Sequence, residues 1–280
     1  MSLLVALWVG LQWPDDKLHI TFCDVGQGDA ELIIKGSMQI LIDTGSSDGE
    51  ILECLGNNVP FWDSEIEIVV LTHPQKDHMG ALDAVVERYD VGKLVANGIP
   101  GSGEEWDKIA GMVADSGVPV FIPEAGDELR VGDLRLAVLW PRTEKGSKLV
   151  WEGEQTEVLG ANNDVNEISI VMRLEYGQFT AMFTGDLGIK EEQALLGMGV
   201  IVPVDVLKVA HHGSKNSSSE DFVETVKPKL AVIEVGKNNV YGHPSSITTK
   251  RFDMVGSRIM RTDINGEVDI VSDGKNWWVE

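Results

Sequence analysis

The stretch His73-Pro74-Gln75-Lys76-Asp77-His78 brings two imidazoles and a carboxylate together within six residues. It follows an apolar run at residues 67–71, which predicts a strand, and it precedes residues 79–89, whose apolar spacing predicts a helix. A loop between a strand and a helix can direct several such side chains at one point. Imidazole nitrogens with a carboxylate suit Zn²⁺ and also Mn²⁺ or Fe²⁺. We therefore expect a metal site at this junction.

The later ligand-type residues also follow predicted strands. They are Asp186, His211, His212 and His243. Loops at strand ends converge in layered α/β architectures, so we expect Asp186 and at least one of the three late histidines to meet the first motif. The sixth histidine, His19, lies inside a strand predicted at residues 18–23 and is expected to pack there.

The order of the predicted elements indicates the fold class. Antiparallel strands are predicted at residues 18–23, 30–34 and 39–42, and strands and helices then alternate. Residues 128–139 predict a hairpin that turns at Gly132-Asp133. Two strand-rich halves, each interleaved with helices, predict an α/β fold: an αββα sandwich of two mixed β-sheets, packed face to face and flanked by helices.

Two segments fall outside this pattern. Residues 1–17 begin with an apolar run that is too short to span a bilayer and lacks the basic start of a signal peptide. This segment is a membrane-segment remnant, a weak anchor or an N-terminal strand, and we expect it to be dispensable for the metal site. Residues 18–280 are expected to form one hydrolase-like domain, with the polar residues 142–163 as an exposed loop over the site.

The composition, 43% hydrophobic and 24% charged, is that of a globular protein. A formal charge of −22 argues against nucleic-acid binding by the whole surface, because phosphate affinity comes mainly from Lys and Arg. Residues 205–261 are the least acidic part, with nine Lys/Arg against six Asp/Glu. Cys23 and Cys54 are too few for a disulfide framework, and we expect both to be small core residues without a disulfide partner.

Six stretches together resemble the metallo-β-lactamase superfamily and, within it, the hydrolase-like domain of the ComEC family of DNA-internalisation proteins. They occur in the family's order and cover about residues 18–275. The stretches are Phe22-Cys23-Asp24-Val25-Gly26-Gln27-Gly28-Asp29-Ala30, Ile42-Asp43-Thr44-Gly45, Leu71-Thr72-His73-Pro74-Gln75-Lys76-Asp77-His78-Met79-Gly80, Phe183-Thr184-Gly185-Asp186, Leu207-Lys208-Val209-Ala210-His211-His212-Gly213-Ser214 and Gly242-His243-Pro244. The resemblance implies the αββα fold and a hydrolase activity.

The chain departs from the superfamily pattern at one of two metal positions. The pattern H-x-H-x-D-H, with a later His, builds the first position, but here Gln75 replaces the second His and Asn166 stands where the later His is expected. The second position keeps Asp77, His78 and the bridging Asp186, with a late histidine to complete it. The resemblance therefore implies one firmly bound divalent metal, Zn or Mn, and a second that is weak or absent.

Roles can be assigned to the remaining side chains of the motifs. A bound metal can lower the pKa of a water molecule towards about 7. Asp77 is the candidate general base, and His212, or its neighbour, is the candidate that protonates the leaving oxygen. Asp43 either orients a ligand imidazole or caps a turn. The glycines beside Asp29 predict a tight turn, which either lets the backbone come near a site or ligand or is only a turn. Residues 214–219 with two lysines, Lys208 and Lys215, form either a phosphate-binding loop or a helix-capping loop.

The leading hypothesis is a phosphodiesterase or nuclease that acts on DNA in competence, beside a separately encoded membrane DNA channel. An extracytoplasmic or membrane-associated location follows from the resemblance, and a cytoplasmic one follows if residues 1–17 are not an anchor. Two alternatives stay open. One is a small-substrate hydrolase that cleaves a thioester, lactone, lactam or phosphoester, and the other is a binding domain whose turnover is weakened by Gln75 and Asn166.

Overall fold

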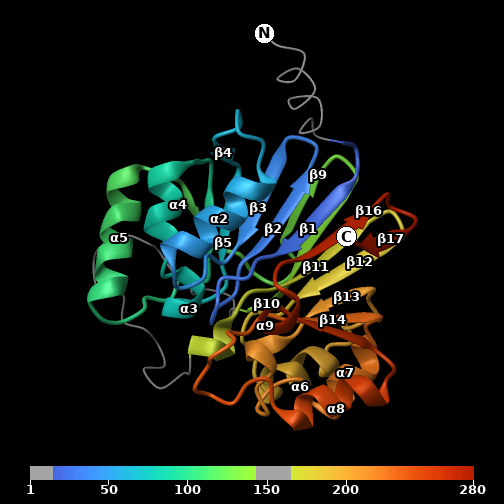
Figure 1. The fold of residues 1–280 in the computed structure, drawn as a ribbon. Helices are drawn as coiled ribbons and strands as arrows, with labels where there is room; N and C mark the ends of the chain where they lie inside the picture. Colours follow the sequence, from blue (N-terminus) through green and yellow to red (C-terminus); the bar gives the residue numbers. More distant parts are fainter. Residues whose placement is uncertain (1–14, 143–164) are drawn as a thin grey trace.

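The computed structural model describes residues 15–142 and 165–280 of the chain. The apolar run at the start of the chain and nearly all of the loop expected at residues 142–163 lie outside these ranges. Two large β-sheets occupy the centre of the described part, and helices cover the outer face of each sheet (Figure 1). This arrangement confirms the predicted αββα sandwich of two mixed sheets.

The first sheet has eight strands, and its parallel half carries the histidine-rich motif. Strands β3, β5, β7 and β8 pair in parallel, and the strands from β3 back to β17 pair antiparallel. The order across the sheet is β17 (Trp277–Val279), β16 (Val268–Ser272), β1 (Leu18–Phe22), β2 (Glu31–Lys35), β3 (Met38–Ile42), β5 (Ile68–Leu71), β7 (Leu94–Ala96) and β8 (Val120–Phe121). A separate parallel pair joins β4 (Glu65–Ile66) to β6 (Asp90–Val91).

The second sheet has seven strands, and its parallel half carries the later motifs. Strands β12 to β15 pair in parallel, whereas β9 to β12 pair antiparallel. The hairpin expected at residues 128–139 is confirmed as β9 and β10. The order is β15 (Arg258–Arg261), β14 (Leu230–Ile233), β13 (Val206–Lys208), β12 (Phe179–Phe183), β11 (Val171–Tyr176), β10 (Leu134–Trp140) and β9 (Glu128–Val131).

Three apolar clusters hold the layers together, and alternation along the strands builds them. On β2, Ile33 joins the cluster between the two sheets, whereas Leu32 points to the helices outside the first sheet. That outer cluster includes residues of α2 (Asp48–Asn58), α4 (Leu82–Arg88) and α5 (Glu104–Ser116). The third cluster packs α6 (Ile189–Gly197), α7 (Glu220–Val226) and α8 (Ser246–Met254) on the second sheet. Two one-turn helices, α3 (Lys76–Met79) and α9 (Thr262–Asn265), complete the described set.

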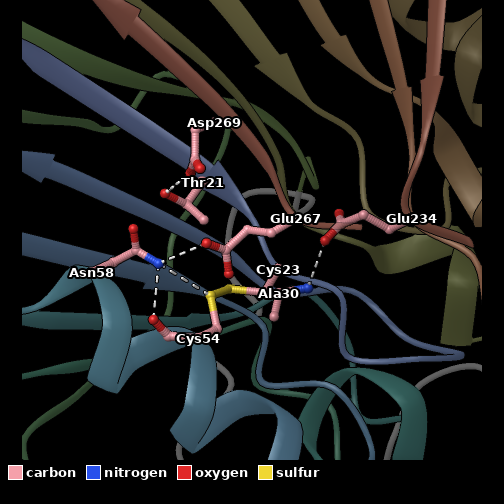
Figure 2. Close-up of a disulfide and its surroundings, with 8 residues drawn as sticks. All are labelled: Thr21, Cys23, Ala30, Cys54, Asn58, Glu234, Glu267 and Asp269. Carbon is pink, nitrogen blue, oxygen red and sulfur yellow. Dashed lines mark hydrogen bonds between the residues drawn. A yellow bond between two sulfur atoms is a disulfide. The ribbon is translucent and has the colours of Figure 1, made fainter. Parts of the chain in front are cut away.

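The expectation that the two cysteines are unpaired is wrong. Cys23, at the end of β1, and Cys54, on α2, form a disulfide (Figure 2). Both residues are buried, as expected, but the helix that brings them together was not predicted. Asn58 reinforces the junction, since its Nδ2 donates to the carbonyl of Cys54 at 2.9 Å and to Glu267 at 3.0 Å. The bond therefore clamps the start of the Gly-rich turn to α2.

His19 lies on β1, as predicted, but it does not pack in the core. Its Nε2 lies 2.9 Å from a carboxylate oxygen of Asp15, and 37% of its side chain is exposed. Among the described residues, no helix combines the length and apolar character needed to cross a membrane.

Candidate metal centre

The predicted ligands reach one centre from the carboxyl ends of strands in both sheets. The contributing positions are His73 after β5, Asp77 and His78 on α3, Asp186 after β12, His211 and His212 on the 3₁₀ helix η2 (Ala210–Gly213) after β13, and His243 between β14 and α8. Parallel strands in each sheet end on the same side, so the facing edges of the two sheets bring these segments together.

Hydrogen bonds fix which nitrogen of His73 and of His78 faces the centre. His78 Nδ1 donates to Asp43 at 2.7 Å, which leaves Nε2 free. The Thr72 hydroxyl donates to the same carboxylate at 2.6 Å, so towards His73 Nδ1, 3.0 Å away, it can only accept. His73 therefore carries its proton on Nδ1 and presents an unprotonated Nε2. Asp43 thus orients an imidazole, which was one of its two expected roles.

His212 is oriented in the same way from the second sheet. Its Nδ1 lies 2.9 Å from the carbonyl oxygen of Glu234, which can only accept a hydrogen bond, so Nδ1 carries a proton and Nε2 is the nitrogen that turns to the centre. Its Nε2 lies 3.4 Å from a carboxylate oxygen of Asp77 and 3.9 Å from one of Asp186. Nε2 of His78 and Nε2 of His212 thus both lie near Asp186, at 3.3 and 3.9 Å.

Asp186 is the residue that joins the two halves of the centre. One carboxylate oxygen lies 3.3 Å from His78 Nε2, and the other lies 3.7 Å from His211 Nε2. His211 is the partly exposed member of the histidine pair, with 29% of its side chain accessible against 2% for His212. His243 is more peripheral, since its ring centroid lies 5.9 Å from that of His211.

Several buried polar atoms at this centre have no hydrogen-bond partner within the described ranges. They are His73 Nε2, His78 Nε2 and both carboxylate oxygens of Asp186. Leaving such atoms unpaired in a buried place is costly unless an ion or water satisfies them. The ligand atoms of His73, His78 and Asp186 lie within 4.8 Å of one another, as do those of Asp77, His78 and His212. A divalent cation fits this donor set of imidazoles and carboxylates.

The protonation states suit a cation. Burial, together with the charge of His78, lowers the pKa of His73 to about 3, so its imidazole is neutral at pH 7. Burial raises the pKa of Asp77, but the hydrogen bond to His212 and the charge of His78 outweigh it and lower this pKa to about 2. For Asp186, burial is likewise outweighed by His78 and His212, and the pKa falls well below its usual range. His73 and the two carboxylates are thus in their ligand forms. For His78, burial lowers the pKa, but Asp186 and Asp43 outweigh it and raise this pKa well above its usual value, so a cation must displace a proton from Nε2.

The two amides that depart from the family pattern are paired with each other. Gln75 Nε2 donates to Asn166 Oδ1 at 2.9 Å, across the junction between α3 and the 3₁₀ helix η1 (Val165–Ile168). They therefore lie side by side, as expected for two positions on one side of the site. An amide oxygen is a neutral ligand and a weaker one for Zn²⁺ than imidazole, and here that of Asn166 already accepts a hydrogen bond.

The main chain is strained at the site. Among the described residues, five positions other than glycine have positive φ, and three of them are Asp43, His211 and His212, at φ of 56°, 54° and 52°. Strain of this kind collects at functional sites. The Gly-rich turn also lies against the site, because a Cβ on Gly28 would collide with the carbonyl of Asp77. This close approach was one predicted role of the turn.

Two buried residues beneath the site were missed by sequence reasoning. Lys208, on β13, is fully buried and forms an ion pair with Asp29, which is also fully buried. Lys208 therefore cannot take part in the phosphate-binding loop considered for residues 214–219. The available signal was a lysine inside the apolar run Val206-Leu207-Lys208-Val209-Ala210, which calls for a buried anion.

Comparison with known proteins agrees with these observations. The model of the metallo-beta-lactamase superfamily matches residues 23–236. ComE operon protein 3 of Bacillus subtilis is 30% identical over 89% of this chain and 32% of its own length. Competence protein ComA of Neisseria gonorrhoeae is 28% identical over 90% of this chain and 32% of its own length. Recombination protein 2 of Haemophilus influenzae is 28% identical over 92% of this chain and 29% of its own length. The chain thus spans about a third of the length of these relatives.

Solved structures share the fold at low sequence identity. The metallo-β-lactamase fold protein YhfI from Bacillus subtilis superposes with a TM-score of 0.56 at 12% identity, covering 94% of this chain and all of that one. The diiron β-hydroxylase CmlA from Streptomyces venezuelae superposes with a TM-score of 0.56 at 15% identity, covering 89% of this chain and 53% of that one. At this level of identity the likeness concerns the fold alone.

Proposed function

The chain belongs to the metallo-β-lactamase superfamily, and from that premise we propose that it is a metal-dependent nuclease that cleaves phosphodiester bonds of DNA in a DNA-uptake system. The observation that carries the proposal is the cluster of buried, unpaired ligand atoms on His73, His78 and Asp186. Relatives named as competence proteins favour DNA as the substrate. The less acidic residues 205–261 supply three of the candidate ligands, which is consistent with an anionic substrate.

We assign the firmly bound ion to Asp77, His78 and the bridging Asp186, with His212 as the late histidine that completes the set, while His73 faces Asp186 from the other position. In the neutral ring of His212, Nδ1 donates to Glu234, so Nε2 offers its lone pair on the side that faces both carboxylates. The paired amides of Gln75 and Asn166 leave a second ion with weaker ligands, so its occupancy is expected to be low.

The exposure of each side chain decides the role in hydrolysis that we assign to it. A bound divalent ion would supply Lewis-acid polarisation of the phosphoryl oxygen and of the attacking water. Asp77 is ionised and 28% exposed, so it can accept a proton from that water. His211 is the accessible histidine of the pair and is assigned the proton transfer to the leaving oxygen, which the motif alone had suggested for His212.

The disulfide favours the extracytoplasmic alternative for location. Such bonds form and persist in oxidising compartments and are rare in the cytosol. The Cys23–Cys54 bond is buried against the site-bearing turn, so it belongs to the folded core of this protein. We therefore place the domain outside the cytoplasm, where it can meet incoming DNA before a separately encoded membrane channel takes it up.

The proposal is tested by a nuclease assay on single- and double-stranded DNA with Mn²⁺, Mg²⁺ or Zn²⁺. Asp186→Asn should abolish cleavage, whereas Asp133→Asn, on the exposed β9–β10 turn, should retain it. A metal-loaded parent protein that cleaves neither form of DNA with any of the three ions would refute the nuclease. The formal charge of −22 favours a small-substrate hydrolase as the second candidate, and cleavage of a generic phosphodiester or thioester without cleavage of DNA would support it.

A further inference from the structure

We propose that Lys208 and Asp29 act as a positioning pair that holds His212 with its Nε2 towards Asp77 and Asp186. The inference deepens the proposed function, and it rests on the assignment of His212 to the metal centre. Both side chains are fully buried, so neither of them can contact a substrate. Their effect must therefore pass through the groups that they contact.

Burying the two charges of this pair costs desolvation free energy, so a gain in stability does not explain why the pair is present. Lys208 lies on a strand whose three residues are all buried, between β12 and β14 of the second sheet. Asp29 comes from the Gly-rich turn of the first sheet, 179 residues away along the chain. Taking two charges out of water is expensive, and well-packed apolar residues of similar volume are often at least as stable. A buried ion pair between two sheets is thus weak evidence for stability and better evidence for a specific geometry.

The contacts of Asp29 specify that geometry. One oxygen binds Lys208, and the other lies 3.1 Å from His212 Nδ1, whose proton goes to the carbonyl of Glu234; this second oxygen meets His212 as a charge contact and has no hydrogen-bond partner within the described ranges. The backbone of Asp29 is fixed as well, because its N–H donates to the carbonyl of Asp77 at 3.0 Å. Asp29 therefore places a carboxylate oxygen against the rear nitrogen of His212 and fixes the loop that carries Asp77.

The contacts of Lys208 extend to the other carboxylate of the centre. Its Nζ donates to the carbonyl of Gly185 at 3.0 Å and lies 4.0 Å from an oxygen of Asp186. One ammonium thus joins the turn that holds Asp29 to the turn that carries Asp186. By occupying one oxygen of Asp29, it leaves the other oxygen for His212, whose left-handed backbone conformation needs support from its neighbours.

The test must separate positioning from folding. Lys208→Met alone leaves Asp29 buried and unpaired, which can prevent folding, so the informative variant is Lys208→Met/Asp29→Leu, in which both charges are removed. Lys229→Met is the matched control, because Lys229 lies between α7 and β14, directly before a strand of the same sheet, and is 70% exposed. Circular dichroism and a urea unfolding curve establish that each variant is folded.

Three measurements then read the state of His212. In the folded double variant, ¹⁵N NMR of the imidazoles should show a shifted Nδ1 resonance of His212, because the carboxylate of Asp29 is gone while the carbonyl of Glu234 remains. The affinity for Mn²⁺ or Zn²⁺ should fall about 10- to 100-fold, as for other partners of metal-ligating histidines. The kcat for DNA cleavage should fall with KM little changed, and the losses should nearly disappear when the pair is changed in a His212→Asn background.

Each outcome decides one of the two proposals. An unchanged His212 NMR signature in the folded double variant, or equal losses with and without His212, would overturn the positioning role. A parent protein that binds metal but does not cleave DNA would refute the nuclease, while a changed NMR signature together with weakened metal binding in the double variant would still support the positioning pair. Lys229→Met should match the parent protein in all three measurements.

Discussion

Removing the Cys23–Cys54 disulfide should destabilise the protein by an amount that the chain separation sets. The two cysteines are 31 residues apart, and the bond closes that loop in the unfolded chain. The loop-closure relation gives about 3.7 kcal/mol of stabilisation at 25 °C for a loop of this length. We therefore expect the Cys23→Ala/Cys54→Ala variant to have a free energy of unfolding lower by at least that amount.

Urea unfolding followed by tryptophan fluorescence is a suitable assay, since the chain has eight tryptophans. Adding a reductant to the parent protein is the matched control, because it breaks the cross-link in the unfolded chain without changing any side chain. Reductant should lower the stability of the parent towards that of the variant and leave the variant unchanged. A difference below about 1 kcal/mol between the oxidised and the reduced parent would refute this reasoning.

Three further predictions follow from the site and its surroundings. Gly28→Ala should lower the free energy of unfolding by about 1–3 kcal/mol in a urea titration, because its Cβ would collide with the Asp77 carbonyl, whereas Gly49→Ala, with open space around it, should not. Burial and a neighbouring carboxylate raise the pKa of Glu31 well above its usual value, so its ionisation opposes folding as the pH rises above about 4.5. Glu31→Gln should therefore be more stable than the parent protein at pH 8 and nearly equal to it at pH 4 in parallel urea titrations; a parent whose stability relative to this variant does not fall with pH would contradict this. Gln75→His should raise the occupancy of the second metal position, and equal metal content in the variant and the parent protein would count against it.

The strands that carry the motifs were predictable because their signals are local. The run before His73 and the hairpin at residues 128–139 are short apolar segments bounded by turn residues, and both formed as expected. Helix α8 was not predicted, because its sequence is rich in polar and β-branched residues. It begins at a serine cap, where Ser245 accepts a hydrogen bond from the Ile247 N–H, and it is held by packing on the second sheet.

The strands at the end of the chain depend on distant partners. Strand β16 pairs with β1, with Leu18 opposite Ser272, so only the assembled sheet fixes its place. The disulfide likewise depends on distant segments. No spacing rule links Cys23 to Cys54 in the sequence, and the two cysteines meet only when α2 forms. Sequence reasoning therefore missed contacts between segments that lack a local signal.

The candidate site also combines residues that have a local sequence signal with residues that lack one. His73, Asp77 and His78 form one recognisable motif, and the family resemblance added Asp186 and the late histidines. The residues behind them were harder to find, because Asp29 follows glycines in an apparent turn and its partner, Lys208, is far along the chain. Which late histidine faces the carboxylates likewise depends on the backbone conformation of η2, which a sequence pattern does not specify.

Elemental analysis of the purified protein after dialysis measures how many divalent ions are firmly held at the centre formed by His73, Asp77, His78 and Asp186. We expect close to one Zn or Mn per chain in the parent protein and in Asp133→Asn, and almost none in Asp186→Asn, because Asp186 joins the two halves of the ligand set. Two tightly held ions per chain, with Gln75 or Asn166 among the ligands, would contradict this expectation, as would a metal content unchanged in Asp186→Asn.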